Sequence, residues 1–416
     1  MLDDSKGLLG NEQAAFAKGA SLAAEKKMRT NNLPSEDMVE TTMTRVKMGR
    51  YDPIATFSVM LQVNEFFQHE NHAPIQCVVR YIDRDGGNLV TRVFTRRLAV
   101  AKEMGEFLDA VDEEVVPVLL GKEAVYRSMY GRDIAESKDA DVVDSIELDD
   151  LAYDAQRDLD ATIQRISVAY RLLGLEKGTR RGFDLTEEGG VAAAGSSVDF
   201  AFPPELADAL RRLYHFRRGP ILSPGPMQSM DDRAEIRSLF TRLPLEDCLG
   251  MMAFSMWSSG PLGTQDRVPA PLTVPPDTLA LWDDAIIAGD HYYVMFIWSG
   301  RSALDSRYDP VRKNFKHFLT ERSRNRFPMP LLHELAEGDS MSRRFTALLA
   351  PSHGDPVEQQ LANFPSLGKL APNELTALQA KFKFYDPKTD PSFRNWFWSV
   401  ASASSSCKDE GVSLCE

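Results

Sequence analysis

The spacing of apolar residues changes along this chain, and this change constrains the fold more than any other feature of the sequence. Over residues 56–95, apolar and β-branched residues alternate roughly with polar ones, which is typical of strands with one buried face. Over residues 103–130 and 151–173 they recur every three or four positions, which is typical of helices. After Pro244, short apolar runs alternate with helical segments. The sequence therefore predicts an α+β, multi-domain chain.

The strand-rich part predicts an antiparallel sheet. Strands are expected over residues 56–63, 75–82 and 89–95. Residues 83–88 contain Gly86-Gly87, a composition that favours a hairpin turn between the last two strands.

The helical part predicts several helices joined by polar connections. These helices are expected over residues 103–130, 151–173, 205–216 and 231–242. Residues 131–150 are acidic and have few large apolar side chains, so we expect a solvated connection there.

The last third predicts a mixture of both kinds of element. Strands are expected over residues 251–257, 291–298 and 344–349, helices over 315–322, 375–382 and 392–401, and a helix or an extended segment over 279–288. Residues 403–416 are rich in serine and predict a flexible tail.

The net charge disfavours one class of partner. The chain carries 61 Asp and Glu against 48 Lys and Arg, a net charge of −13. Because nucleic-acid binders are usually basic, we expect no nucleic-acid partner. The acidic side chains are concentrated in residues 101–160, whereas the C-terminal third is mildly basic.

The spacing of the cysteines limits the kinds of metal site that this chain can form. The cysteines are Cys77, Cys248, Cys407 and Cys415, and no two of them have the Cys-x-x-Cys spacing. This excludes a zinc site built from cysteine pairs, and we expect no cofactor. No apolar run is long enough to span a bilayer, so any membrane contact is expected to be peripheral.

The sequence shows no self-contained active site. It has no glycine-rich phosphate loop and no Gly-x-Ser-x-Gly elbow. His333-Glu334 lacks the second histidine of a metalloprotease motif, and His69 with His72 would supply too few metal ligands. What remains is the pair Arg343-Arg344, either an ordinary surface pair or a guanidinium that enters the anionic site of a partner.

Several short segments, in this order, resemble the C-terminal half of one family, the GTPase-activating subunit of the COPII inner coat (the Sec twenty-three type). The RFPMP segment with the Arg-Phe pair after it is the most specific of them. The segments are Asp52-Pro53 with the strands after it, Phe200 to Pro204 with Leu210-Arg211-Arg212, Met252 to Gly260, Asp290 to Gly300, and Arg326 to Pro330 followed by Arg344-Phe345 and Ala350-Pro351-Ser352.

The resemblance implies an architecture. It implies a partial antiparallel β-sandwich over residues 49–104, an all-α helical domain over 105–243 and a gelsolin-like α/β domain over 244–402. Residues 1–48 stay unassigned. The family's N-terminal zinc finger and α/β trunk have no counterpart in this sequence, and the cysteine spacing agrees with the lack of a zinc finger.

The resemblance also implies a function that regulates an enzyme and is not itself enzymatic. The implied activity is to stimulate the small Arf-like coat GTPase in transport from the endoplasmic reticulum to the Golgi, through Arg344 as an arginine finger, with Arg343 as its rival. Implied partners are that GTPase, the cargo-adaptor coat subunit in a heterodimer, and an anionic membrane surface. The implied location is cytoplasmic and peripheral, on the endoplasmic reticulum membrane at its exit sites and on COPII vesicles.

Four arginines are candidates for the contact with the membrane or a partner: Arg211, Arg212, Arg217 and Arg218. The alternative is that Arg211 and Arg212 are ordinary solvated helix charges. Two alternative functions also stay open. One is a structural coat or adaptor protein without GTPase-activating activity, and the other is a gelsolin-like actin binder, which rests on fold analogy alone.

Overall fold

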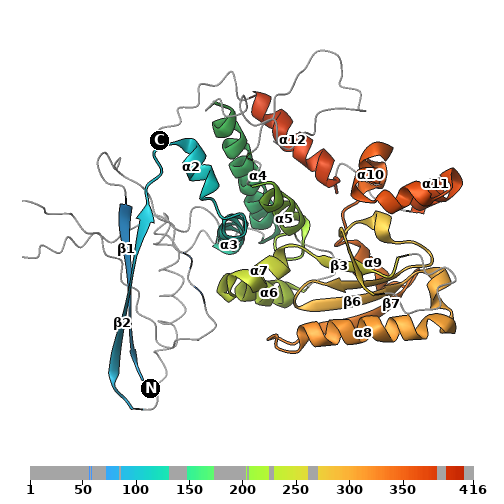
Figure 1. Cartoon of the computed structure of the whole chain (residues 1–416), viewed down its shortest axis with the longest axis horizontal. Helices are drawn as coiled ribbons and strands as arrows, with labels where there is room; N and C mark the ends of the chain where they lie inside the picture. Colours follow the sequence, from blue (N-terminus) through green and yellow to red (C-terminus); the bar gives the residue numbers. More distant parts are fainter. Residues whose placement is uncertain are drawn as a thin grey trace, which may run out of the picture.

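The computed structural model describes residues 56, 58, 72–83, 86–130, 148–172, 203, 206–223, 229–260, 270–381 and 390–406. These residues form a hairpin, a layer of helices and a sheet covered by helices on both faces (Figure 1). The structure is therefore mixed helix and sheet, as predicted.

The hairpin consists of β1 (His72–Ile82) and β2 (Leu89–Ala99), which pair antiparallel. Its turn places Gly87 at φ 64, a left-handed conformation that glycine adopts without strain. Both predicted strands and the turn are confirmed, and β2 runs on to Ala99. The expected strand over residues 56–63 lies largely outside the described residues.

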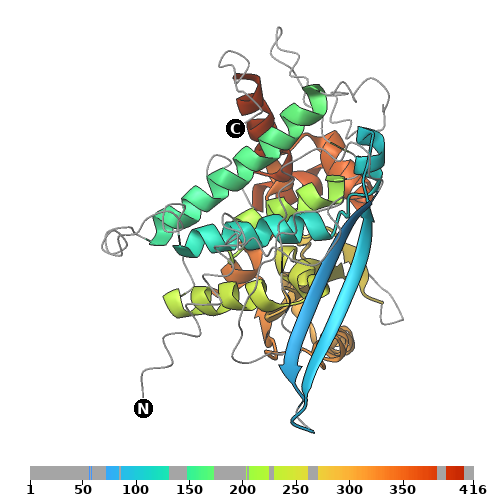
Figure 2. The same ribbon diagram turned by 90° about the vertical axis from the view of Figure 1, so that its left-hand side faces the viewer.

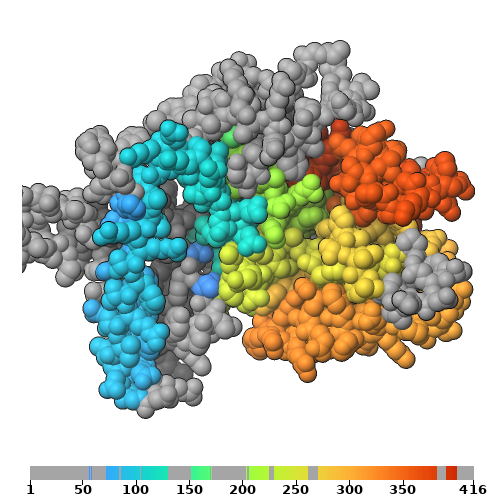
Figure 3. Space-filling model, viewed as in Figure 1, coloured from blue at the N-terminus to red at the C-terminus, as the bar shows by residue number. Residues whose placement is uncertain are grey.

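Most side chains of the hairpin are exposed. Only Val90 among the residues of β2 is even half-buried, and the hairpin forms one edge of the molecule (Figures 2 and 3). Val78 and Val93, which pair across the strands, are 46% and 55% exposed.

The helical layer contains the four predicted helices, but it differs from the prediction at three points. Helix α7 was not predicted, and α4 begins at Leu148, inside the connection expected over residues 131–150, of which residues 131–147 lie outside the described residues. The expected helix over residues 103–130 is two helices, because the Asp112 carboxylate accepts the backbone N–H groups of Glu114 and Val115 and starts a new helix there. The helices are α2 (Met104–Asp109), α3 (Val115–Tyr130), α4 (Leu148–Leu172), α5 (Ala207–Arg218), α6 (Met230–Arg242) and α7 (Leu245–Met252).

The C-terminal helix α12 (Phe393–Ser406) belongs to the helical layer in space, although it follows the sheet in sequence. Trp396, Phe397 and Val400 join the apolar core formed by α3 to α7. The Trp396 indole N–H donates to Asp160 Oδ1 at 3.1 Å. Residues 403–406 belong to α12, so the predicted flexible tail is wrong for them, and its remaining residues 407–416 lie outside the described residues.

The second module is a five-stranded sheet in the order β4-β3-β5-β6-β7. Neighbours pair antiparallel, except that β6 and β7 are parallel. The strands are β3 (Ser255–Ser258), β4 (Leu272–Val274), β5 (Ile286–Asp290), β6 (Val294–Ser299) and β7 (Leu331–Ala336).

Helices cover both faces of this sheet (Figure 1). Met295 and Ile297 of β6 pack against α8 (Asp309–Ser323). Phe296 and Trp298, which alternate with them, pack on the other face against α9 (Ser342–Thr346) and α11 (Pro372–Lys381). Strand β6 is thus buried on both sides. The short helix α10 (Val357–Asn363) lies between α9 and α11 in the chain.

Three predictions in this module are wrong. The expected strand over residues 344–349 is the helix α9 and the turn after it, because Phe345, Leu348 and Leu349 recur at helical spacing and two of them are fully buried. Residues 251 and 252 end α7 rather than begin a strand. Residues 291–293 form a turn before β6, with Tyr292 at φ 64.

The sequence predicted either a helix or an extended segment over residues 279–288, and the structure has a short piece of each kind there. The segment starts in a 3-10 turn (Thr278–Ala280) and ends inside β5. Strand β7 was not expected at all. The predicted helices over residues 315–322, 375–382 and 392–401 are present as α8, α11 and α12.

Two histidines lie where the helical layer meets the five-stranded sheet module. They are His215 on α5 and His291 directly after β5. Burial lowers the pKa of His215 to about 3 and that of His291 to about 4. The charges of Arg218 and Arg211 add to the shift at His215, whereas Asp290 opposes the shift at His291. Both rings are therefore neutral in the folded protein at neutral pH.

We expect the folded state to lose stability as the pH falls from 6.5 towards 4, partly through His291. The unfolded chain takes up a proton at the ordinary pKa of histidine, whereas the folded chain resists it. His291→Phe keeps an aromatic ring against Phe254 and Tyr293 and removes the titration. Denaturant unfolding across this pH range should show a shallower loss than in the wild type. The exposed His317→Phe is the control, and parallel curves for wild type and His291→Phe would contradict the assignment.

Candidate functional site

The pair Arg343-Arg344 lies on α9, a single turn of helix after strand β7. Both side chains are exposed. Phe345, the next residue, is fully buried, and its ring lies 5.7 Å from that of Phe254 and 5.5 Å from that of Phe296. The two guanidinium groups therefore project from a backbone that is anchored in the core directly beside them.

The loop before α9 is held at several points. Gly338 adopts φ 94, which is readily available only to glycine. The Asp339 carboxylate accepts the backbone N–H of Ala336 at 2.8 Å. Glu337 is bound by Lys381 Nζ at 2.6 Å and accepts the backbone N–H of Arg301 at 2.9 Å.

The start of α9 is also tied to the sheet. The indole N–H of Trp298 donates to the Ser342 hydroxyl at 3.1 Å. Both residues are buried. Residues on either side of the arginine pair thus contact the core.

Arg344 lies within electrostatic reach of the helical layer. Hydrogen bonds with Ser229 chiefly lower the pKa of Asp232 at the start of α6, and the charge of Arg344 adds to this shift. Within the described part of the chain, neither Arg343 nor Arg344 has an ion-pair partner. The pair is therefore exposed and forms no ion pair among the described residues, although Arg344 interacts electrostatically with Asp232 of α6.

The four arginines of α5 divide into two groups. Arg217 binds Asp160 of α4 at 2.9 Å, and Arg218 forms hydrogen bonds of 2.6–3.0 Å with Asp390. These two side chains tie α5 to α4 and to the residues before α12. Arg211 is exposed, with its guanidinium 5.7 Å from the Phe393 ring centre, and Arg212 is half-buried.

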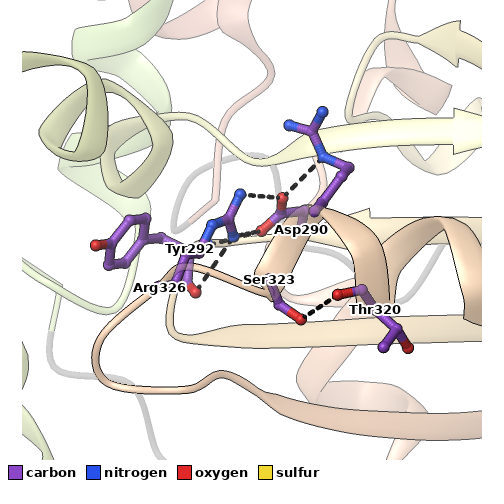
Figure 4. A network of polar contacts seen from close by, with 6 residues as sticks. Asp290, Tyr292, Thr320, Ser323 and Arg326 are labelled. Atoms are coloured by element: carbon purple, nitrogen blue, oxygen red, sulfur yellow. Dashed lines mark hydrogen bonds and ion pairs between the residues drawn. The ribbon is translucent and has the colours of Figure 1, made fainter.

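Sequence reasoning missed a buried ion pair in the sheet module, between Asp290 at the end of β5 and Arg326 (Figure 4). Arg326 Nη1 and Nη2 bind the two carboxylate oxygens at 2.6 and 2.8 Å. Arg322 Nε lies 3.4 Å from Oδ2, and the backbone N–H of Tyr292 donates to Oδ1 at 3.0 Å. The signal in the sequence was the arginine that opens the RFPMP segment, but its partner is 36 positions away.

This network sets the charge of Asp290. Burial alone would raise its pKa, but the hydrogen bonds and charge of Arg326, with the charge of Arg322, outweigh burial and keep the pKa below its ordinary value. Arg326 is therefore engaged inside the protein. The residues after it project outwards, with Phe327 76% and Met329 74% exposed.

The described residues show neither a metal site nor a membrane-spanning helix. No three or more His, Cys, Asp or Glu side chains among them are grouped so as to hold a metal ion. None of the helices described is both long enough and apolar enough to cross a bilayer.

Comparison with known proteins confirms the resemblance to Sec23-type coat subunits. Protein transport protein SEC23 A of Arabidopsis thaliana is 25% identical over 361 residues, which cover 85% of this chain and 35% of that protein. Among solved structures, the human COPII-coat protein Sec24c matches 73% of this chain and 37% of its own, with a TM-score of 0.48 and 14% identity. No protein-family profile matches. The chain spans about one third of the length of its curated relative.

We expect Arg326→Met to cost about 3–5 kcal/mol of folding free energy at neutral pH, because it leaves the Asp290 carboxylate buried without its main partner. In the wild type, the contribution of Asp290 is present above its ordinary pKa of 3.8 and is lost as the pH falls through its lowered value. Without Arg326 the pKa of Asp290 rises, so the deficit should shrink as the pH falls towards 4.

Denaturant unfolding of both proteins at neutral and acidic pH measures this deficit. Arg324→Met is the matched control, because the Arg324 side chain is 73% exposed, and it should change stability by less than about 0.5 kcal/mol. An Arg326→Met deficit no larger than that of the control would contradict the prediction.

Proposed function

We propose that this chain, similar to Sec23-type subunits over 85% of its length, acts in the COPII vesicle coat and stimulates the small coat GTPase through Arg344. The similarity to a protein transport protein supports the coat role. The observation that carries the finer proposal is the exposed Arg344 on a helix anchored by the buried Phe345. The Arg-Phe pair occupies the position that the resemblance implies for an arginine finger.

The chemistry of arginine suits this role. Hydrolysis of GTP moves negative charge onto the oxygens around the transferred phosphoryl group, and a guanidinium held there stabilises the transition state. Arginine stays charged at every physiological pH and offers a planar set of donors to phosphate oxygens. The chain would supply this group in trans, which makes it a regulator of an enzyme and not the enzyme.

Arg343 is the rival because it is also exposed and lies next to Arg344. Neighbouring residues on a helix point about 100° apart. The two side chains therefore cannot enter the same anionic site in the same way, and single substitutions distinguish them.

We assign the modules by the same resemblance. The exposed hairpin would belong to the partial β-sandwich of residues 49–104, the helical layer to the helical domain of 105–243, and the five-stranded sheet with its helices to the gelsolin-like domain of 244–402. The cores of the last two are not separate, since α7 and α12 pack in the helical layer.

The proposed partners are the small Arf-like GTPase, the cargo-adaptor coat subunit and an anionic membrane. For the membrane we favour Arg211, which is exposed, and its neighbour Arg212, because the side chains of Arg217 and Arg218 are only 25% and 9% exposed. The proposed location is cytoplasmic, peripheral on the endoplasmic reticulum membrane and COPII vesicles.

A second candidate is a structural coat or adaptor protein that binds the GTPase without stimulating it. The chain spans 35% of its curated relative, and coat binding could reside in that part without GTPase activation. Binding of the chain to GTPase-loaded vesicles with no rise in hydrolysis would favour this candidate. Actin binding rests on fold analogy alone, and actin pelleting that leaves the chain in solution would dismiss it.

We expect the chain to accelerate GTP hydrolysis by the cognate coat GTPase and Arg344→Ala to remove most of this acceleration. Arginine fingers contribute about 10³–10⁵-fold in rate, so a single-turnover assay of phosphate release resolves the loss. Arg343→Ala is the matched control and should retain most of the acceleration. Equal rates for wild type and Arg344→Ala would contradict the assignment of Arg344 as the finger. Loss of the acceleration in Arg343→Ala, with Arg344→Ala unaffected, would assign the finger to Arg343.

We expect the double variant Arg211→Glu/Arg212→Glu to bind anionic vesicles at least about tenfold more weakly than the wild type. Each basic residue near such a surface contributes about 1 kcal/mol, and 1.4 kcal/mol is a factor of ten. Vesicle sedimentation at increasing salt measures the affinity. The control reverses two exposed charges elsewhere, Lys313→Glu/Arg324→Glu, and an equal loss in both proteins would show general electrostatics and not a specific patch.

A further inference from the structure

We propose that Trp298 and Ser342 are positioning residues for Arg344. The indole N–H of Trp298, at the end of β6, holds the Ser342 hydroxyl at the start of α9 and thereby fixes the direction of the Arg344 side chain. The effect of this contact on the GTPase rate rests on the proposed function. Its effect on the mobility of residue 344 is independent of that function.

The contact is buried and engages both sides of the arginine pair. Trp298 is 1% exposed, and its Nε1 lies 3.1 Å from Ser342 Oγ. The indole ring also stacks near Phe345, with ring centres 6.5 Å apart and an interplanar angle of 25°. One side chain of the sheet therefore touches the residue before Arg343 and the residue after Arg344.

The short helix needs such support. Helix α9 has five residues, and a single helical turn is not stable on its own because nucleation is unfavourable. Its N-cap residue, Met341, forms no side-chain capping hydrogen bond. The orientation of α9 must therefore come from contacts with the sheet.

Contacts on both sides of the arginine pair hold α9 in place. The buried side chains of Phe345 and of Leu349 hold its C-terminal side, and Asp339 and Glu337 hold the loop before it. The hydrogen bond at Ser342 is the directional side-chain contact at the first residue of α9, directly before the arginine pair. A finger that is held in one direction needs no reordering when it enters its partner.

The kinetic test uses Ser342→Ala, Trp298→Phe and the double variant. We expect each single variant to lower the kcat of the stimulated GTPase about 3- to 10-fold, the range of one hydrogen bond, with less than a twofold change in the half-saturating concentration of the chain. The double variant should be no slower than the slower single variant, because both remove one contact. Ser323→Ala is the matched control, since it removes a buried hydroxyl that donates to Thr320 on α8 (Figure 4), and it should leave kcat unchanged.

A second test needs no GTPase. A nitroxide label is attached at Arg344→Cys in a chain whose Cys77, Cys407 and Cys415 are replaced by Ser. Electron paramagnetic resonance should show a restricted label that becomes more mobile when Ser342→Ala is added. The same label at the exposed Arg324→Cys should not respond to Ser342→Ala.

The outcomes separate the two proposals. If Arg344→Ala abolishes the acceleration but the Ser342 and Trp298 variants keep the wild-type kcat and label mobility, the positioning role is wrong and the finger stands. If the wild-type chain gives no acceleration, the proposed function fails, and the label at position 344 still decides whether the Trp298–Ser342 contact orients α9. Additive losses in the double variant would also overturn the positioning role.

Discussion

The burial of β6 on both faces is the constraint on which the rest of the sheet module depends. Met295 and Ile297 face α8, whereas Phe296 and Trp298 face α9 and α11. A strand that is buried on both sides must have apolar side chains at successive positions, and β6 has them. Its neighbour β5 ends at Asp290 and holds Arg326, and its own end carries Trp298, which holds Ser342. The RFPMP loop and the arginine helix are thus fixed to opposite ends of one central pair of strands.

The arginines of this chain serve two different purposes, which sequence alone could not separate. Arg217, Arg218 and Arg326 bind carboxylates inside the protein, whereas Arg343 and Arg344 face solvent. Buried ion pairs recover little net stability after desolvation, but losing one partner is costly. Their effect here is to specify which elements meet, since each joins segments that are distant in sequence.

Much of the fold followed from apolar spacing, because spacing reports which side of an element is buried. Apolar spacing predicted β1, β2 and α8 and the helices of the helical layer except α7. It gave a wrong prediction at α9, where Phe345, Leu348 and Leu349 fit a helix better than a strand, and it gave no prediction for β4 or for β7, an edge strand with mixed exposure. The candidate finger was located through the resemblance, and spacing alone left it open. Asp290 could not be linked to Arg326, because an ion pair depends on tertiary contacts that no local pattern encodes.

The position of α12 has a consequence for how the protein is made. The hydrogen bond from Trp396 to Asp160 joins residues 236 positions apart, and the apolar core of the helical layer includes side chains of both α4 and α12. On the ribosome, the early helices emerge long before the helix that completes their core. Part of the apolar surface of these helices therefore stays exposed until α12 has been synthesised. Contacts between residues so far apart in sequence slow folding. The core of the helical layer, whose first helices are made early, can therefore be completed only when the C-terminal helix α12 is in place.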